Sequence, residues 1–125
     1  MKKYRNFTSK EFDCPSLKGS GKNMQEDFMD MLQEAREIAG CVFRITSGYR
    51  TQQYHDDLGR RGYKTAKNSA HLEGRAADIA CTDSVTRWLI VNSLLLAGFN
   101  RIGIASTFIH VDNSDTKKSN TIWTY

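Results

Sequence analysis

Hydrophobic residues recur at helical spacing in two segments of the chain. Between Asn23 and Gly40 they follow one another at steps of three, one, three and three positions, which matches one face of a helix (Phe28, Met31, Leu32, Ala35 and Ile38). Asn23 is expected to cap this helix, because Glu26 follows three residues later, and Gly40 is expected to end it. A second, more apolar helix is predicted from Ser84, its expected cap, to Gly98.

Shorter stretches predict strands and one further helix. The segment 41–46 alternates loosely and is expected to form the first strand. A short polar helix is predicted to begin at Thr51 and to end at Gly59 or Gly62. Small residues around Asp78 indicate a closely packed strand. Three more strands are predicted towards the C-terminus (101–105 and 108–112, joined as a hairpin, and 121–125).

The order of these elements predicts the fold class. Because helices and strands are partly segregated along the chain, we expect an α+β fold in which a small antiparallel sheet packs against about three helices. A chain of 125 residues is long enough to bury one core, so residues 1–125 are predicted to form a single domain. The hydrophobic share of 39% and the charged share of 26% exclude the disordered and fibrous classes of protein.

No segment of the sequence predicts a membrane span or a signal peptide. The longest apolar stretch, 88–97, is interrupted by Asn92 and Ser93, and it is shorter than the roughly 20 residues that a span needs. The N-terminal residues 1–6 are basic, but no apolar run follows them. We therefore expect no signal peptide.

The charge of the chain is mildly basic. The net charge of +4 and the pI of about 9.1 are compatible with an acidic partner, either nucleic acid or an anionic wall polymer, and equally with a solvated surface. The basic residues are scattered, and no aromatic-rich basic stripe or groove-reading motif accompanies them. Nucleic-acid binding is therefore not expected.

The cysteines carry no metal-binding spacing. Cys14, Cys41 and Cys81 are odd in number and lie far from one another in the sequence. We interpret them as small buried hydrophobic residues in a reducing compartment. One disulfide with a remaining free thiol is the alternative.

Two histidines and an aspartate are placed where they can form a metal site. His71 precedes the strand that carries Asp78, a carboxylate expected to be buried among small apolar neighbours. Such a carboxylate is costly unless it is paired or binds a metal. His110 alternates with Phe108 and Asp112 along their strand, so these three side chains are expected to share one face. Two imidazoles and a carboxylate are a common ligand set of catalytic zinc, although a buried His–Asp pair produces the same pattern.

One run of residues resembles a family signature. The segment 69–78 reads Ser-Ala-His-Leu-Glu-Gly-Arg-Ala-Ala-Asp. It resembles the Ser-x-His-x-x-Gly-x-Ala-x-Asp signature of the zinc D-alanyl-D-alanine carboxypeptidases, whose relatives include phage endolysins and the zinc-binding domain of hedgehog proteins. The upstream segment 45–50, Ile-Thr-Ser-Gly-Tyr-Arg, and the segment 108–112, Phe-Ile-His-Val-Asp, are similar to two further elements of that family. With 7–14 and 123–125 also similar, the resemblance covers nearly the whole chain and implies the fold of that family.

The resemblance implies a zinc ion held by three protein ligands (His71, Asp78 and His110). It also implies that Ser69 and Gly74 shape the ligand loop. Arg50 is expected beside the metal, where a guanidinium can hold a substrate carboxylate or polarise the scissile carbonyl. Its alternative role is a surface salt bridge. Ser69, Tyr49 and Trp123 are further candidates for contact with substrate, with packing as the alternative for Tyr49 and closure of the core for Trp123.

The general base departs from the family pattern. The family usually places an acidic residue three positions before the third ligand, and that position is Thr107 here. Asp112 is the nearby catalytic candidate, and its alternative role is to orient His110. Glu73, which follows the first ligand, is a third option. His55 is expected to be a surface residue.

Two functions follow from the resemblance. The first is a zinc peptidase, either a carboxypeptidase or an endopeptidase, that hydrolyses amide bonds in peptidoglycan stem peptides. The small chain is expected to be monomeric and made in the cytoplasm, and to reach the wall after lysis, by non-classical delivery or in a phage particle. Its features fit a phage-encoded lysis or tail-associated enzyme, and a stand-alone module is the alternative. The second is a non-catalytic zinc-stabilised binding or structural module, such as a tail-associated one, and the threonine at position 107 is the feature that favours it.

Overall fold

The computed structural model describes all residues from 1 to 125 and confirms the α+β class. It contains three α-helices (α1, Glu26–Ala39; α2, Gln52–Arg60; α3, Ser84–Leu96). Five strands form one sheet (β1, Ile45–Ser47; β2, Ala76–Ala80; β3, Arg101–Ile104; β4, Phe108–Asp112; β5, Thr121–Thr124). Two short 3-10 helices, Ser9–Phe12 and Ser20–Asn23, precede α1.

The strands are ordered β1-β2-β4-β3-β5 across the sheet. The pairs β1–β2, β2–β4 and β3–β4 are antiparallel, and the predicted hairpin between β3 and β4 is confirmed. The last pair departs from the expected antiparallel sheet, because β5 runs parallel to β3. The segment 113–120 carries the chain from the end of β4 past β3 to the free edge of the sheet, which makes this parallel pairing possible.

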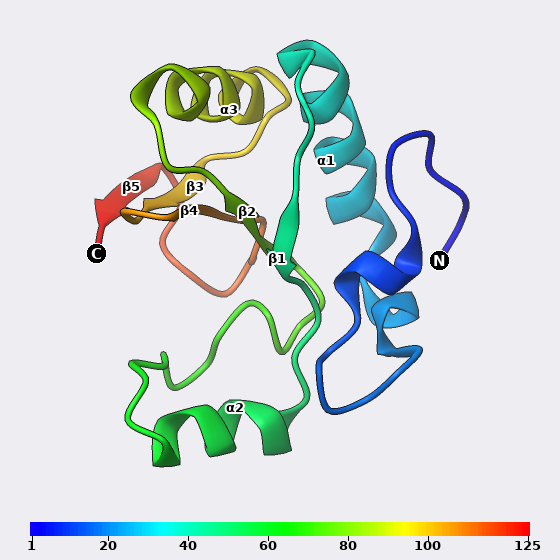
Figure 1. Ribbon diagram of the computed structural model, residues 1–125, viewed down its shortest axis with the longest axis vertical. Coiled ribbons are helices and arrows are strands. Elements are labelled where there is room, and N and C mark those ends of the chain that lie inside the picture. Colours follow the sequence, from blue (N-terminus) through cyan, green and yellow to red (C-terminus); the bar gives the residue numbers. More distant parts are fainter.

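The two faces of the sheet have different roles. In Figure 1, α3 and the upper part of α1 lie above the sheet, whereas α2 lies below it, beyond the loops that follow β1 and α2. The alternate residues Ile79, Ile109 and Val111 are fully buried and belong to the core with Phe28 of α1 and Leu94 of α3. Period-two alternation therefore directs the polar residues of β2 and β4 to the opposite face, as predicted for β4.

Helix α1 starts later than predicted. Asn23 is the last residue of the second 3-10 helix and not the cap of α1, which begins at Glu26. The reason is a close contact with Gly74, which has a φ of +73° and whose hypothetical Cβ would lie 2.4 Å from the Asn23 carbonyl oxygen. The Gln25 N–H also donates to the Gly74 carbonyl. The start of α1 is thus fitted against the loop that carries His71, at a position where only glycine fits.

The other helix ends agree more closely with the sequence. Gly40 ends α1 with a φ of +67°, as predicted. The Thr51 hydroxyl accepts a hydrogen bond from the Tyr54 N–H and caps α2, which begins at Gln52, one residue after the predicted start. The cap of α3 is Asp83 rather than Ser84, because the Asp83 carboxylate accepts a hydrogen bond from the backbone N–H of Thr86.

Strand β1 is shorter than the predicted segment 41–46. Val42 is 74% exposed, so this part of the segment does not join the sheet. Pairing with β2 begins only where the Ala80 N–H donates to the Arg44 carbonyl. The chain then pairs through Ser47, which lies opposite Asp78. The predicted strand is therefore correct in type and displaced towards the site.

Helix α3 leaves part of its apolar surface exposed (Val85, Trp88, Leu95 and Leu96). No helix of the structure has both the length and the apolar character that crossing a membrane requires.

The three cysteines are free, with Cys14 and Cys81 buried and Cys41 half-buried. This agrees with their interpretation as small hydrophobic residues and not with the disulfide alternative.

Candidate metal centre

A row of residues crosses the sheet on its polar face. Asp78 of β2 lies opposite His110 of β4, and His110 lies opposite Gly103 of β3. Gly103 in turn lies opposite Trp123 of β5. A side chain at Gly103 would collide with the indole, because its Cβ would lie 2.6 Å from the Trp123 Nε1. The glycine therefore lets Trp123 lie across β3 and approach His110, with 5.5 Å between the ring centroids.

The three predicted metal ligands come together at this row. One nitrogen or oxygen atom of each lies within 4.8 Å of the others. The Asp78 Oδ1 is 3.4 Å from the His71 Nε2 and 3.0 Å from the His110 Nδ1. Both histidines are buried, and Asp78 exposes 14% of its side chain. All three line a cleft of about 430 Å³, so the ligand atoms are reachable from one side.

His71 is oriented by the turn that follows β1. Its Nδ1 is 2.8 Å from the carbonyl oxygen of Gly48. A carbonyl only accepts hydrogen bonds, so Nδ1 carries the proton and Nε2 is left as a free ligand atom. The backbone N–H of His71 donates to the hydroxyl of Ser69, and its carbonyl accepts from the Arg50 N–H. The ligand loop and the turn that precedes Arg50 are thus fixed to each other.

His110 is oriented from the other side by Asp112. The His110 Nε2 is 2.7 Å from the Asp112 Oδ2, and Asp112 is only 1% exposed. The second oxygen of Asp112 accepts from the Arg101 Nε at 2.7 Å and from the Ser114 N–H at 3.1 Å. A carboxylate with these donors stays ionised, so the proton of His110 is on Nε2 and its Nδ1 faces Asp78.

The electrostatics of this group favour a cation. Burial alone would raise the pKa of Asp78, but its close contacts with His110 and His71 outweigh it and hold that pKa well below its usual range. Burial would lower the pKa of His110, but its contacts with Asp112 and Asp78 raise it. With the tautomers set by Gly48 and Asp112, three lone pairs point at one another and repel unless a proton or a cation lies between them. The donor set fits a divalent metal ion held by the His71 Nε2, the Asp78 Oδ1 and the His110 Nδ1.

Arg50 lines the same cleft and forms no ion pair. Its Nη2 donates to the Ser47 hydroxyl at 3.3 Å, and its Nη1 is 3.4 Å from the His55 Nδ1. The Nε is buried and has no hydrogen-bond partner. Burial lowers the pKa of the guanidinium, while the nearby charge of Asp78 acts in the opposite direction. The alternative of a surface salt bridge is therefore wrong, and the guanidinium has donors to spare.

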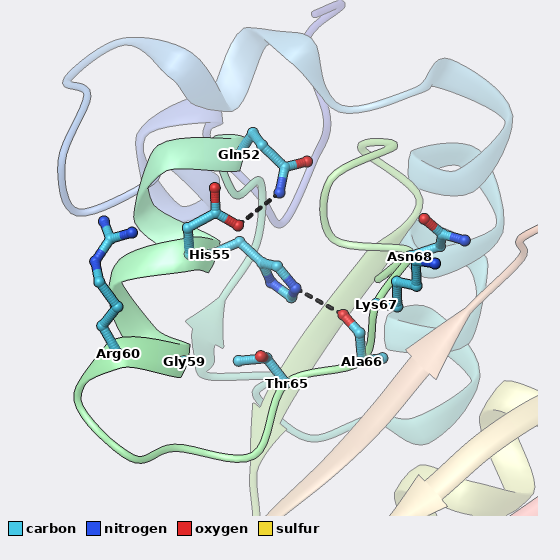
Figure 2. A pocket seen from close by; sticks show the side chains of 9 residues that line it. Gln52, His55, Gly59, Arg60, Thr65, Ala66, Lys67 and Asn68 are labelled. Carbon is cyan, nitrogen blue, oxygen red and sulfur yellow. Dashed lines mark hydrogen bonds between the residues drawn. The ribbon is translucent and has the colours of Figure 1, made fainter.

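The expectation that His55 is a surface residue is wrong. His55 is the buried residue of α2, with 4% of its surface exposed. Figure 2 shows its ring pointing away from the helix towards the backbone of Ala66. The Nε2 is 2.6 Å from the Ala66 carbonyl oxygen. The polar residues around it in the sequence gave no sign of burial, because the loop that covers it follows α2 without a regular pattern.

Of the remaining residues considered in the sequence analysis, some line the cleft and others lie outside it. Trp123 lines the cleft, whereas Tyr49 packs against the hydrophobic core and does not line it. Thr107 lies in the turn between β3 and β4, where its carbonyl accepts from the Cys81 N–H. Glu73 accepts hydrogen bonds from the Ser114 hydroxyl through both of its oxygens. Neither Thr107 nor Glu73 lines the cleft.

Among the cleft residues that the sequence analysis missed are three with cationic side chains and one with a phenol: Lys64, Arg101, Lys117 and Tyr125. Arg101 could have been found, because it alternates with Gly103 on β3 and so shares the face of the site. Its guanidinium carbon lies 4.9 Å from the centre of the Trp123 ring. Lys64 and Lys117 come from loops, where no periodic pattern indicates the direction of a side chain. Burial raises the pKa of the Tyr125 phenol.

Comparison with known proteins identifies the family. A family model described as Peptidase M15 matches residues 5–112, a span that includes Arg50 and all three ligand residues. No curated protein matches the sequence. Peptidases of this family depend on a metal ion, in agreement with the convergence of His71, Asp78 and His110. The chain therefore belongs to the Peptidase M15 family of metallopeptidases.

Proposed function

We propose that this protein is a zinc-dependent peptidase that hydrolyses amide bonds in peptidoglycan stem peptides. The observation that carries the proposal is the convergence of three oriented ligand atoms in a cleft that also holds an unpaired arginine. Two imidazole nitrogens and one carboxylate oxygen leave room for a further ligand, as in catalytic rather than structural zinc sites. When bound, zinc polarises a carbonyl group and makes a water molecule more acidic.

The proposed role of Arg50 is to hold a negatively charged oxygen of the substrate. Its three nitrogens make only two long contacts, both to neutral groups, and none to a carboxylate. A guanidinium donates two parallel hydrogen bonds to a carboxylate, and it also stabilises charge that develops on a carbonyl oxygen. Arg50 and Asp78 line the same cleft, so a substrate oxygen held by Arg50 would share that cleft with the ligand group.

The charges at the mouth of the cleft support an acidic peptide as the substrate. Lys64 and Lys117 line the cleft together with Arg50, and neither lysine is paired with a carboxylate. The acidic residues that line it, Asp78 and Asp112, are both engaged by histidines. Three unpaired cations around the cleft attract a peptide that has several free carboxylates. Stem peptides of the bacterial wall have this chemistry.

We propose that Asp112 orients His110 rather than acting as the general base. Its two oxygens already accept three hydrogen bonds, from His110, Arg101 and Ser114, and burial leaves it 1% exposed. Burial alone would raise the pKa of Asp112, but His110 and Arg101 outweigh it and hold that pKa below its usual range. A carboxylate with these partners is poorly placed to take a proton from water.

Replacing Asp112 with asparagine is expected to weaken zinc binding by about 10–100-fold, because the charge that makes the imidazole a better ligand is lost. The single amide oxygen can still accept from His110, but Arg101 and Ser114 then lose their acceptor. At saturating zinc, the rate of peptide hydrolysis should fall by less than about tenfold. Competition with a zinc-binding dye measures the affinity, and Asp115→Asn, which removes an exposed carboxylate three residues later, is the matched control. A rate that falls by more than about 100-fold at unchanged zinc affinity would identify Asp112 as the base instead.

The competing function is a non-catalytic zinc module. The observation that favours it is that the cleft contains no free carboxylate, since both of its acidic residues are engaged and Thr107 lies outside it. The proton of the attacking water would then be taken by another group of the cleft, or no group would take it and the protein would not hydrolyse peptides. The two functions share the metal site and differ only in turnover.

The deciding experiment measures bound metal and peptide cleavage on the same sample. Purified protein with one equivalent of zinc is incubated with stem peptides and with intact wall fragments, and the products are identified by mass spectrometry. Loss of one terminal residue indicates a carboxypeptidase, and two peptide products indicate an endopeptidase. The same protein after chelation, and again after zinc is restored, is the control. Stoichiometric zinc with every fragment intact would leave the binding module as the function.

A further inference from the structure

His55 contacts two residues that line the cleft, although it does not line the cleft itself. Its Nδ1 is 3.4 Å from the Nη1 of Arg50, and its Nε2 is 2.6 Å from the carbonyl oxygen of Ala66. Arg50 and Ala66 both line the cleft that holds the ligand group, and so does Thr65 beside Ala66. Figure 2 shows the ring spanning the space between α2 and the segment 65–68. One buried side chain therefore touches the unpaired cation and one wall of the cleft.

The partners of the ring determine its protonation state. The Ala66 carbonyl can only accept a hydrogen bond, so the His55 Nε2 must carry a proton. The guanidinium of Arg50 can only donate, so Nδ1 must offer a lone pair. Both contacts are satisfied together only by the neutral imidazole with its proton on Nε2. Few side chains have one donor and one acceptor separated in this way, and a hydrophobic ring of equal size has neither.

Arg50 has little else to hold it in place. Apart from the ring of His55, its guanidinium contacts only the Ser47 hydroxyl, at 3.3 Å. Its Nε has no partner, and no carboxylate lies within ion-pair distance. A long, flexible side chain in this situation loses its orientation when one of two contacts is removed. The guanidinium is thus oriented by two hydrogen bonds, and His55 supplies one of them.

We propose that His55 is a positioning residue that sets the guanidinium of Arg50 for binding a substrate carboxylate and at the same time fixes the Thr65–Ala66 wall of the cleft. This inference rests on the proposed function, in which Arg50 holds a charged oxygen of the peptide. His55 does not touch the substrate itself, because its ring lies behind Arg50 and Ala66 and outside the cleft lining. Its effect on the reaction passes through these two residues.

The test compares two substitutions at the same position in the zinc-loaded protein. His55→Phe keeps the volume of the ring and removes both contacts, so KM for a stem peptide is expected to rise about tenfold, with a smaller change in kcat. His55→Gln keeps one donor and one acceptor in its amide and is expected to bring KM back to within about threefold of wild type. Gln52→Ala, which removes an exposed bond to Asp56 on the same helix, is the matched control.

A double-mutant cycle separates positioning from a general effect on folding. If His55 acts through Arg50, adding His55→Phe to Arg50→Ala should change kcat/KM by less than about twofold, although the same change costs about tenfold in the wild-type background. Thermal unfolding of each variant is measured alongside. Equal losses in both backgrounds, or a glutamine variant as impaired as the phenylalanine one at full stability, would overturn the proposal.

A spectroscopic measurement keeps this inference separate from the proposed function. The 15N–1H signal of the Arg50 Nε, assigned by comparison with Arg50→Lys, reports the order of the guanidinium without any substrate. It is expected to shift and broaden in His55→Phe and to stay close to wild type in His55→Gln. An unchanged signal in His55→Phe overturns the positioning role even if the protein is an active peptidase. A changed signal in a protein that cuts no peptide supports the positioning of Arg50 and removes only the peptidase function.

Discussion

Replacing His110 with alanine is expected to reduce bound zinc from one equivalent to less than about a tenth of an equivalent after dialysis. The change removes one of three protein ligands and leaves only the His71 Nε2 and the Asp78 Oδ1 facing each other. Apparent binding free energies of zinc sites with a full ligand set are about 10–16 kcal/mol, so the loss of one ligand removes a large share. Metal analysis of the dialysed protein measures the effect directly.

The same variant should also lose the stabilisation that zinc provides. A ligand that binds only the folded state raises the free energy of unfolding by about 2.7 kcal/mol at 100 times its Kd, so the melting temperature of the wild type is expected to rise when zinc is added. The melting temperature of His110→Ala should stay unchanged. His55→Gln is the control, because it removes a histidine that lies outside the ligand group. Full zinc occupancy in His110→Ala would show that the ligand set has been assigned wrongly.

Replacing Arg50 with alanine is expected to lower kcat/KM for a stem peptide by about 100-fold while zinc occupancy stays at the wild-type level. Arg50 lines the cleft and has no carboxylate partner, so its removal is expected to take away a contact with the substrate and breaks no internal ion pair. The folded protein should therefore be little changed. The measurement is steady-state kinetics together with metal analysis of the same preparation.

Arg50→Lys distinguishes charge from geometry. Lysine restores the positive charge but cannot donate two parallel hydrogen bonds, so it should recover only part of the lost activity. Arg87→Ala, on α3 and bonded only to the Ser84 hydroxyl, is the control for loss of an arginine elsewhere. If Arg50→Ala retained wild-type kcat/KM, the role assigned to the guanidinium would be wrong, whereas a loss of zinc would show that Arg50 supports the ligand loop instead.

The parts of the site that follow a periodic pattern could be predicted from the sequence. Alternation along 108–112 predicted His110 and Asp112 on one face and Ile109 and Val111 on the other. The structure has this arrangement, with Ile109 and Val111 in the core. The other two candidate ligands, His71 and Asp78, came from their match to a family signature. A periodic pattern could not have shown that they lie beside His110, because it describes only residues that are neighbours in one helix or strand. The contacts of the ligands with Gly48 and Asp112 then follow from the fold.

The parts that depend on loops could not be predicted. Lys64 and Lys117 reach the cleft from segments without periodicity, so nothing in the sequence indicates that both of them line it. The burial of His55 is another such case, because the loop that covers it makes contact through a backbone carbonyl, a group that every residue has. The parallel pairing of β5 was missed for a related reason, since local patterns give strand positions but not the edge that the chain reaches.

The pairing of β2 with β4 also bears on how the protein folds. Asp78 and His110 are 32 positions apart, with helix α3 and strand β3 between them in the chain. Contacts of this separation generally form late, because the entropy of closing the chain is lost before the contact can repay it. We therefore expect a metal ion held by all three residues to bind after β2 and β4 have paired, rather than to nucleate folding. Removing the metal is then expected to leave the sheet folded.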